Sequence, residues 1–245
     1  MTAKLYAVPA SHPCAVAERA LELKGLPFER VDLLPGAHKL QQRIRFGGAT
    51  VPGLVLEGGE KVLGSRAILR RLDELAPEPP LVPADPARGA EVMRAEEWGD
   101  EVLQPIVRRL IWASLRRAPG ALASYAEGAH LPVPAGVAAL GARPVAWAEV
   151  KINGAGDSTA RADLVNLPHH LDRIDGWIAA GVLGGPAINA ADLQILTSLR
   201  LLLTLGDVAP LIDARPAGAL ARRHFPDFPG HVAPGTLPAD WLPAR

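Results

Sequence analysis

The first 75 residues alternate between short apolar runs and segments with helical spacing. The pattern predicts strands at residues 5–8 and 28–33, with a helix between them that starts at Pro13 and is closed by Gly25. Pro35 and Gly36 end the second strand, and a short helix is expected over residues 37–45. Because the first two strands flank a crossover helix, they should be parallel.

A hairpin and a third helix follow in the pattern. Residues 54–56 and 61–63 flank Glu57-Gly58-Gly59-Glu60, which is typical of a tight turn between antiparallel strands. Ser65 is expected to cap a helix that runs to about residue 75. The order β-α-β-α-β-β-α therefore predicts an α+β domain over residues 1–76, with a mixed four-stranded sheet and three helices.

Proline marks the next boundary. Residues 77–86 hold five prolines, which fit neither a helix interior nor a sheet interior, so this segment is predicted to be a stiff linker. Residues 87–245 show helical periodicity alone and are predicted to form an all-helical domain. A long helix over residues 87–117 should kink at Pro105, and Pro168 implies a kink or a late start in a later helix.

The end of the chain carries one further capping signal. Asn189, followed three residues later by Asp192, resembles a capping box ahead of a buried helix over residues 193–205. The tail from Phe225 is rich in Pro and Gly and carries Trp241 near its end. We expect this tail to wrap the surface of the helical domain.

Composition and charge exclude several classes of function. The 26 Lys and Arg residues equal the 26 Asp and Glu residues, so no large field draws the chain to nucleic acid or to a membrane surface. Cys14 is the only cysteine, which excludes an intrachain disulfide and a cysteine metal cluster. The adjacent His169 and His170 point in different directions, so no metal is expected. The cysteine usage fits a cytoplasmic protein, which is the expected location. The apolar segments are too short for a signal peptide or a membrane span.

The segment Ser11-His12-Pro13-Cys14 stands between the first strand and the first helix. A helix N-terminus presents unpaired N–H groups, which stabilise an anion such as a thiolate. Thioredoxins and glutaredoxins place Cys-x-Pro-Cys at this point, and here Ser11 replaces the first cysteine. A serine cannot form a disulfide, but it can donate a hydrogen bond to a bound sulfur.

Two further motifs follow in the order that a thioredoxin-like domain requires. Val51-Pro52 precedes the third strand, where that fold has a cis proline whose preceding residue pairs with a peptide-like ligand. Gly64-Ser65-Arg66 begins the next helix, where a hydroxyl and free N–H groups can hold a carboxylate.

Together, these three motifs resemble the glutathione transferase family over about residues 3–75, and residues 183–192 are similar to the family's glycine-rich turn and helix cap. The Ser-x-Pro-Cys motif is similar to that of the theta and delta classes, and Gly25 stands at their spacing from the serine. One departure is Gly64, where the family usually has Glu or Asp.

The resemblance implies a thioredoxin-like domain followed by an all-helical domain, assembled as a homodimer that serves detoxification. The protein would bind glutathione as a co-substrate, stabilise its thiolate through Ser11, and transfer it to a hydrophobic electrophile bound between the domains near residues 98–112. The residues implied in glutathione binding are His38, Val51, Pro52, Gly64, Ser65 and Arg66.

Alternatives remain open on the sequence alone. Ser11 can be a simple helix cap and Cys14 a small packed residue. Cys14 can instead be the nucleophile of a thiol–disulfide oxidoreductase of the omega or glutaredoxin type. A non-catalytic thiol-binding protein is kept open by Gly64, and an isomerase of the zeta type and a physiological thiol other than glutathione are open as well.

Overall fold

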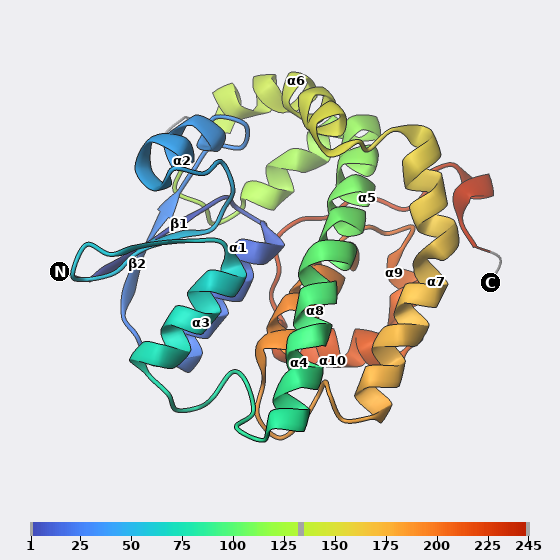
Figure 1. The fold of residues 1–245 in the computed structure, drawn as a ribbon. Helices are drawn as coiled ribbons and strands as arrows, with labels where there is room; N and C mark the ends of the chain where they lie inside the picture. The colour runs from blue at the N-terminus through green and yellow to red at the C-terminus, as the bar shows by residue number, and fades with distance from the viewer. Residues whose placement is uncertain (1, 132–134, 244–245) are drawn as a thin grey trace.

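The computed structural model describes residues 2–131 and 135–243 (Figure 1). The strands of the first domain form one sheet in the order β2-β1-β3-β4, in which β1 is parallel to β2 and antiparallel to β3. The predicted mixed four-stranded sheet with three helices is confirmed. Its elements are β1 (Ala3–Ala7), α1 (His12–Leu23), β2 (Phe28–Asp32), α2 (His38–Phe46), β3 (Gly53–Val55), β4 (Lys61–Leu63) and α3 (Ser65–Leu75).

Helices α1 and α3 lie next to one another, between the sheet and the helical domain, whereas α2 lies apart from them (Figure 1). Each buries an apolar stripe at helical spacing, for example Val16 and Ala20 in α1 and Ile68 and Leu72 in α3. Gly25 has a φ of +63°, which closes α1 in the left-handed conformation as predicted.

The start of α3 corrects one prediction. Gly64, rather than Ser65, is the residue that caps the helix, and its φ of +93° with ψ of 144° is a conformation that glycine alone adopts readily. Ser65 is the first helical residue, and no side-chain hydrogen bond caps the helix. The Ser65 hydroxyl is therefore free for contacts outside its own helix.

The second domain is helical, as predicted. The long helix expected over residues 87–117 is continuous but contains a π-helical segment, Gly99–Leu103, directly before the turn that holds Pro105. Pro168 lies inside a helix that begins well before it. The helices are α4 (Pro86–Trp98), α5 (Gln104–Arg117), α6 (Ala135–Asn153), α7 (Asp157–Ala179), α8 (Ala190–Leu202), α9 (Ala209–Asp213) and α10 (Pro216–His224), with 3₁₀ segments at Pro119–Ala126 and Ala239–Trp241.

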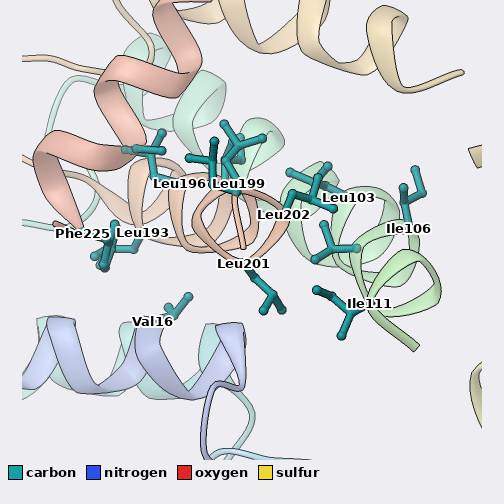
Figure 2. Close-up of a cluster of buried hydrophobic side chains, with 14 of the residues drawn as sticks. Val16, Leu103, Ile106, Ile111, Leu193, Leu196, Leu199, Leu201, Leu202 and Phe225 are labelled. Carbon is teal, nitrogen blue, oxygen red and sulfur yellow. The ribbon is translucent and has the colours of Figure 1, made fainter. Parts of the chain in front are cut away.

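Helix α8 is the centre of the molecule, and every one of its residues is buried. The predicted capping box is confirmed: Asn189 Oδ1 accepts from the Asp192 N–H at 3.0 Å, and Asp192 Oδ2 accepts from the Asn189 N–H at 3.0 Å. Figure 2 shows Val16 of α1 pointing toward α8, whose Leu202 lies beside Leu103 of the helical domain. A single apolar core thus joins the two domains.

The tail beyond α10 returns along the helical domain. Val232 pairs with the segment that directly follows α8. Its N–H donates to the Thr204 carbonyl at 2.9 Å, and its carbonyl accepts from the Gly206 N–H at 2.9 Å. Trp241 is buried near the end of the tail. No helix in the described ranges is long and apolar enough to cross a membrane.

Candidate functional site

The strand register brings four chain segments to one edge of the sheet, meaning here the edge at which its strands begin or end. Ala7 at the end of β1 pairs with Asp32 at the end of β2, and Tyr6 pairs with Gly53 at the start of β3. Gly53 in turn pairs with Leu63 at the end of β4. The loops that leave β1, β2 and β4, and the loop that enters β3, therefore meet at this edge. They carry Ser11, His38, Ser65 and Val51 respectively.

The Val51–Pro52 peptide bond is cis, as predicted. The Pro52 carbonyl accepts the Gly64 N–H at 2.8 Å, which ties this loop to the start of α3. Among the described residues, no hydrogen bond uses the Val51 N–H. This backbone group is therefore available to a peptide-like ligand.

Ser11 caps α1 with its backbone but not with its side chain. Its carbonyl accepts the Ala15 N–H at 3.0 Å, while its hydroxyl makes no capping hydrogen bond. The hydroxyl instead interacts with the sulfur of Cys14. The simple helix-cap interpretation of this side chain therefore lacks its defining hydrogen bond.

The Cys14 thiol is an unfavourable nucleophile in this environment. The residue is 1% exposed, and its burial raises the pKa of the thiol to about 11, although hydrogen bonds from the Ser11 side chain and the Val8 backbone act in the opposite direction. A thiol with that pKa is almost fully protonated at neutral pH, which disfavours the Cys14-dependent reaction.

His12, beside Ser11 in the chain, is a buried residue for which sequence reasoning assigned no role. The Ser198 hydroxyl donates to the Gln194 carbonyl at 3.0 Å, so its oxygen accepts from His12 Nδ1 at 3.0 Å. Burial, followed by the charge of Arg108, lowers the pKa of His12 well below 6.5, so the imidazole is neutral. Its Nε2 has no hydrogen-bond partner in the described part of the chain.

Ser65 faces the helical domain. The residue is 5% exposed, and its Oγ accepts a hydrogen bond from Gln194 Nε2 at 3.1 Å. Because the amide donates, the hydroxyl proton of Ser65 remains for another acceptor. Gln194 lies 129 residues away in the sequence and follows no motif, so pattern reasoning had no signal with which to find it.

The neighbouring Arg66 is engaged by acidic residues of the helical domain. Its guanidinium lies 3.7 Å from a carboxylate oxygen of Glu97 and 3.5 Å from one of Glu101. The side chains are partly exposed, so these pairs are weak and can exchange for a ligand carboxylate.

His38 begins α2 and is held in one tautomer. The Gly36 N–H donates to His38 Nδ1 at 3.1 Å, which leaves the ring proton of the neutral imidazole on Nε2. Burial lowers the pKa of His38, while the carboxylate of Glu149 on α6 opposes this change. His38 can therefore donate one hydrogen bond, although the nearby Glu149 disfavours an anion there.

A cavity of about 470 Å³ lies beside Ser11. One wall is the face of α1 that carries Ser11, Cys14 and Glu18, and the opposite wall is residues 223–229. No residue between 98 and 112 lines it. Trp98 instead packs against Trp177, with a ring-centroid distance of 5.1 Å, inside the helical domain. The end of α10 and the tail that follows it therefore line this cavity, and the long helix does not.

The structure thus groups the predicted residues in two ways. Ser11 and Cys14 share the cavity, while His38, Val51, Ser65 and Arg66 are absent from its lining. Ser11 is the residue that belongs both to the cavity and to the edge of the sheet. Within the described ranges, no group of three or more His, Cys, Asp or Glu residues is arranged to hold a metal ion.

Comparison with known protein families finds a match in the first domain. Residues 5–80 match the family model described as "Glutathione S-transferase, N-terminal domain". No curated protein matches the chain.

Solved structures match over nearly the whole length. A glutathione S-transferase from Rhodospirillum rubrum F11 is 22% identical, with a TM-score of 0.62 and coverage of 98% of both chains. The β-etherase LigF from Sphingobium sp. strain SYK-6 is 22% identical, with a TM-score of 0.61 and coverage of 91% of this chain and 99% of its own. A glutathione S-transferase-I bound with lactoylglutathione is 18% identical, with a TM-score of 0.63 and coverage of 91% and 93%. At these identities the likeness shows a shared fold.

Proposed function

Because the chain belongs to the glutathione S-transferase family through residues 5–80, and its full length has the fold of such proteins, we propose that it is a glutathione transferase. It binds glutathione, or an equivalent low-molecular-weight thiol, as a thiolate and transfers it to an electrophilic small molecule. Its serine-type motif at Ser11 is the reason to propose that it is of the theta or delta type.

The observation that carries this proposal is the position of the Ser11 hydroxyl. It stands at the N-terminus of α1, is not used to cap the helix, and belongs to a residue that lines the cavity. A hydrogen bond to a charged acceptor contributes about 1.5–3 kcal/mol, and one pKa unit corresponds to about 1.4 kcal/mol. One hydroxyl can therefore lower the pKa of a bound thiol by roughly one to two units, with a smaller contribution from the helix N-terminus.

The sheet edge supplies groups for the rest of a tripeptide. Val51, held by the cis bond to Pro52, offers its free N–H to the peptide backbone. Ser65, with the open N–H groups that follow Gly64, offers donors to the γ-glutamyl carboxylate, and Arg66 offers a charge once its pairs with the helical domain exchange. His38 offers its Nε2 proton to the glycine carboxylate.

The cavity beside Ser11 is the proposed electrophile site. The thiolate attacks the electrophilic carbon from the side of Ser11, a carbon–sulfur bond forms, and the leaving group departs with its electron pair. No general base is required, because the bound thiol is already ionised. We further propose that the protein works as a cytoplasmic homodimer in detoxification, as the family resemblance implies.

Glutathione titration calorimetry combined with a conjugation assay tests the function. We expect glutathione binding and conjugation of 1-chloro-2,4-dinitrobenzene. Binding without turnover on any electrophile supports the non-catalytic alternative, for which the burial of Ser65 and the ion pairs of Arg66 are the favouring observations. A mixed disulfide on Cys14, detected by mass spectrometry, supports the oxidoreductase alternative. Absence of thiol binding overturns the proposal.

A further inference from the structure

Most charged side chains that line the cavity beside Ser11 are already paired. Glu18 accepts from Arg30 at 2.6 Å, and Glu22 accepts from Arg19 at 2.8 Å. These two pairs cover the wall formed by α1 and β2. They neutralise that wall and leave it without a net charge for a ligand.

The opposite wall, residues 223–229, carries one further carboxylate and one imidazole. Asp227 makes no ion pair or hydrogen bond within the described residues, although its charge acts on Arg200. The Arg200 guanidinium donates to the Phe225 carbonyl and, at 3.0 Å, to the Pro226 carbonyl. Burial lowers the pKa of His224, so this imidazole is neutral at physiological pH. Neither group leaves a free positive charge.

Arg223 differs from Arg19 and Arg30, the other two arginines that line the cavity. Its side chain lines the cavity and is exposed, and within the described residues it has no hydrogen bond or ion pair. The preceding Arg222 is paired with both carboxylate oxygens of Asp213, at 2.8 and 2.9 Å, and does not line the cavity. Of these two adjacent arginines, Arg222 is ion-paired, whereas Arg223 is available to a ligand.

Apart from His224 and Asp227, the rest of the wall around Arg223 is apolar. Phe225, Pro226 and Phe228 from the tail face Val8 and Ala10 from the loop before α1. A pocket with these apolar residues and one unpaired guanidinium in its lining suits a ligand with an apolar body and an anionic end. The planar guanidinium can hold a carboxylate through two parallel hydrogen bonds.

We propose that Arg223 selects electrophiles that carry an anionic group, such as a carboxylate, on an apolar body held between the tail and the loop before α1. This inference rests on the proposed function, since it names the substrate class of the same site. The reactive carbon would then lie toward Ser11, with the anionic end at the opposite rim.

Two electrophiles that differ in one carboxylate test this selection: 1-chloro-2,4-dinitrobenzene and 4-chloro-3,5-dinitrobenzoate. For both, the thiolate displaces chloride, which leaves with the bonding electron pair. The readout is the ratio of kcat/KM for the carboxylate to kcat/KM for the neutral compound. The ratio for each variant is divided by the ratio for the unmodified protein, so the different intrinsic reactivities of the two electrophiles cancel.

We expect Arg223→Gln to lower this ratio about tenfold, because one charge-assisted hydrogen bond at a partly exposed site is lost. Arg223→Glu should lower it further, and the effect of Arg223 should shrink as salt is added. Arg222→Gln is the matched control and should leave the ratio unchanged. An unchanged ratio in Arg223→Gln, or an equal fall in Arg222→Gln, overturns the proposal.

A binding measurement separates this inference from the proposed function. If the unmodified protein conjugates neither compound, the transferase proposal fails, and equilibrium dialysis with 3,5-dinitrobenzoate then decides the role of Arg223. Binding that weakens about tenfold in Arg223→Gln and not in Arg222→Gln supports an anion site at this arginine. Equal affinity in the two variants, or no binding, excludes it.

Discussion

Ser65 Oγ accepts a hydrogen bond from Gln194 Nε2, 3.1 Å away, across the interface between the two domains. Four residues further along α8, Ser198 contacts His12 at the start of α1. One turn of a buried helix in the second domain therefore holds the first residues of two helices in the first domain. The two hydroxyl-bearing residues of the candidate site, Ser11 and Ser65, lie at these helix starts.

A double-mutant cycle on this pair measures the contact. We expect Gln194→Leu and Ser65→Ala to show a coupling energy of about 0.5–1.5 kcal/mol in urea unfolding, the usual net value of one buried hydrogen bond. Thr197→Val is the control, because the Thr197 hydroxyl bonds within its own helix to the Leu193 carbonyl. A coupling of Gln194 with Ser65 that is no larger than the coupling of Thr197 with Ser65 would contradict this expectation.

Ser11→Ala tests the proposed mechanism. The pKa of the bound thiol should rise by roughly one to two units, and conjugation at neutral pH should slow by about 10- to 100-fold. Glutathione affinity should change little, because the hydroxyl acts on the sulfur alone. The pKa is measured by ultraviolet titration of the enzyme-bound thiolate. A variant with an unchanged rate and an unchanged pH profile would reduce Ser11 to a backbone cap.

The buried Cys14 thiol gives a separate expectation. With a pKa of about 11, it should react with iodoacetamide very slowly at pH 7, and the rate should rise with pH throughout the range in which the protein stays folded. The unfolded chain should react much faster, as mass spectrometry can follow. Cys14→Ala should retain conjugation and lose about 1 kcal/mol of stability. Rapid labelling of the folded protein at pH 7 would revive the oxidoreductase alternative.

Sequence patterns predicted the first domain nearly element by element because its signals are local. Gly25 closes a helix, Val51-Pro52 marks a strand entry, and the hairpin is encoded in four consecutive residues. The capping box of Asn189 and Asp192 was predictable for the same reason. Each of these signals lies within a few residues and depends on local backbone geometry or on hydrogen bonds between near neighbours in the chain.

The site was less predictable because its contacts are distant in sequence. The contact of Gln194 with Ser65 and the wall made by residues 223–229 arise only when the tail and α8 pack on the first domain. Ser65 was assigned as a cap from its residue type, but the positive φ of Gly64 gives the capping position to the glycine. The expectation of an electrophile near residues 98–112 came from family architecture and from no motif in this sequence, and it stays a prediction.

His12 predicts a dependence of stability on pH. Its pKa in the folded protein lies well below the value of 6.5 expected for the unfolded chain, so below pH 6.5 the unfolded state binds a proton that the folded state does not. Its contribution to stability is complete above pH 6.5 and is lost as the pH falls, at up to about 1.4 kcal/mol per pH unit.

Comparison with His12→Gln isolates this contribution, because the other shifted groups are common to both proteins. Between pH 7 and pH 5, the free energy of unfolding should fall less in the variant than in the unmodified chain. Urea unfolding at a series of pH values provides the measurement. Parallel pH profiles would show that His12 titrates alike in the folded and unfolded states.

The complete burial of α8 has a consequence for how the protein opens. Amide hydrogens of Leu193–Leu202 can reach solvent only when α1 on one side and the other helices on the opposite side have both come away. These amides should therefore exchange with deuterium most slowly in the molecule, at the rate set by global unfolding. The two domains then form one cooperative unit, and a fragment cut at the proline segment would expose the Val16 face of α1 and aggregate.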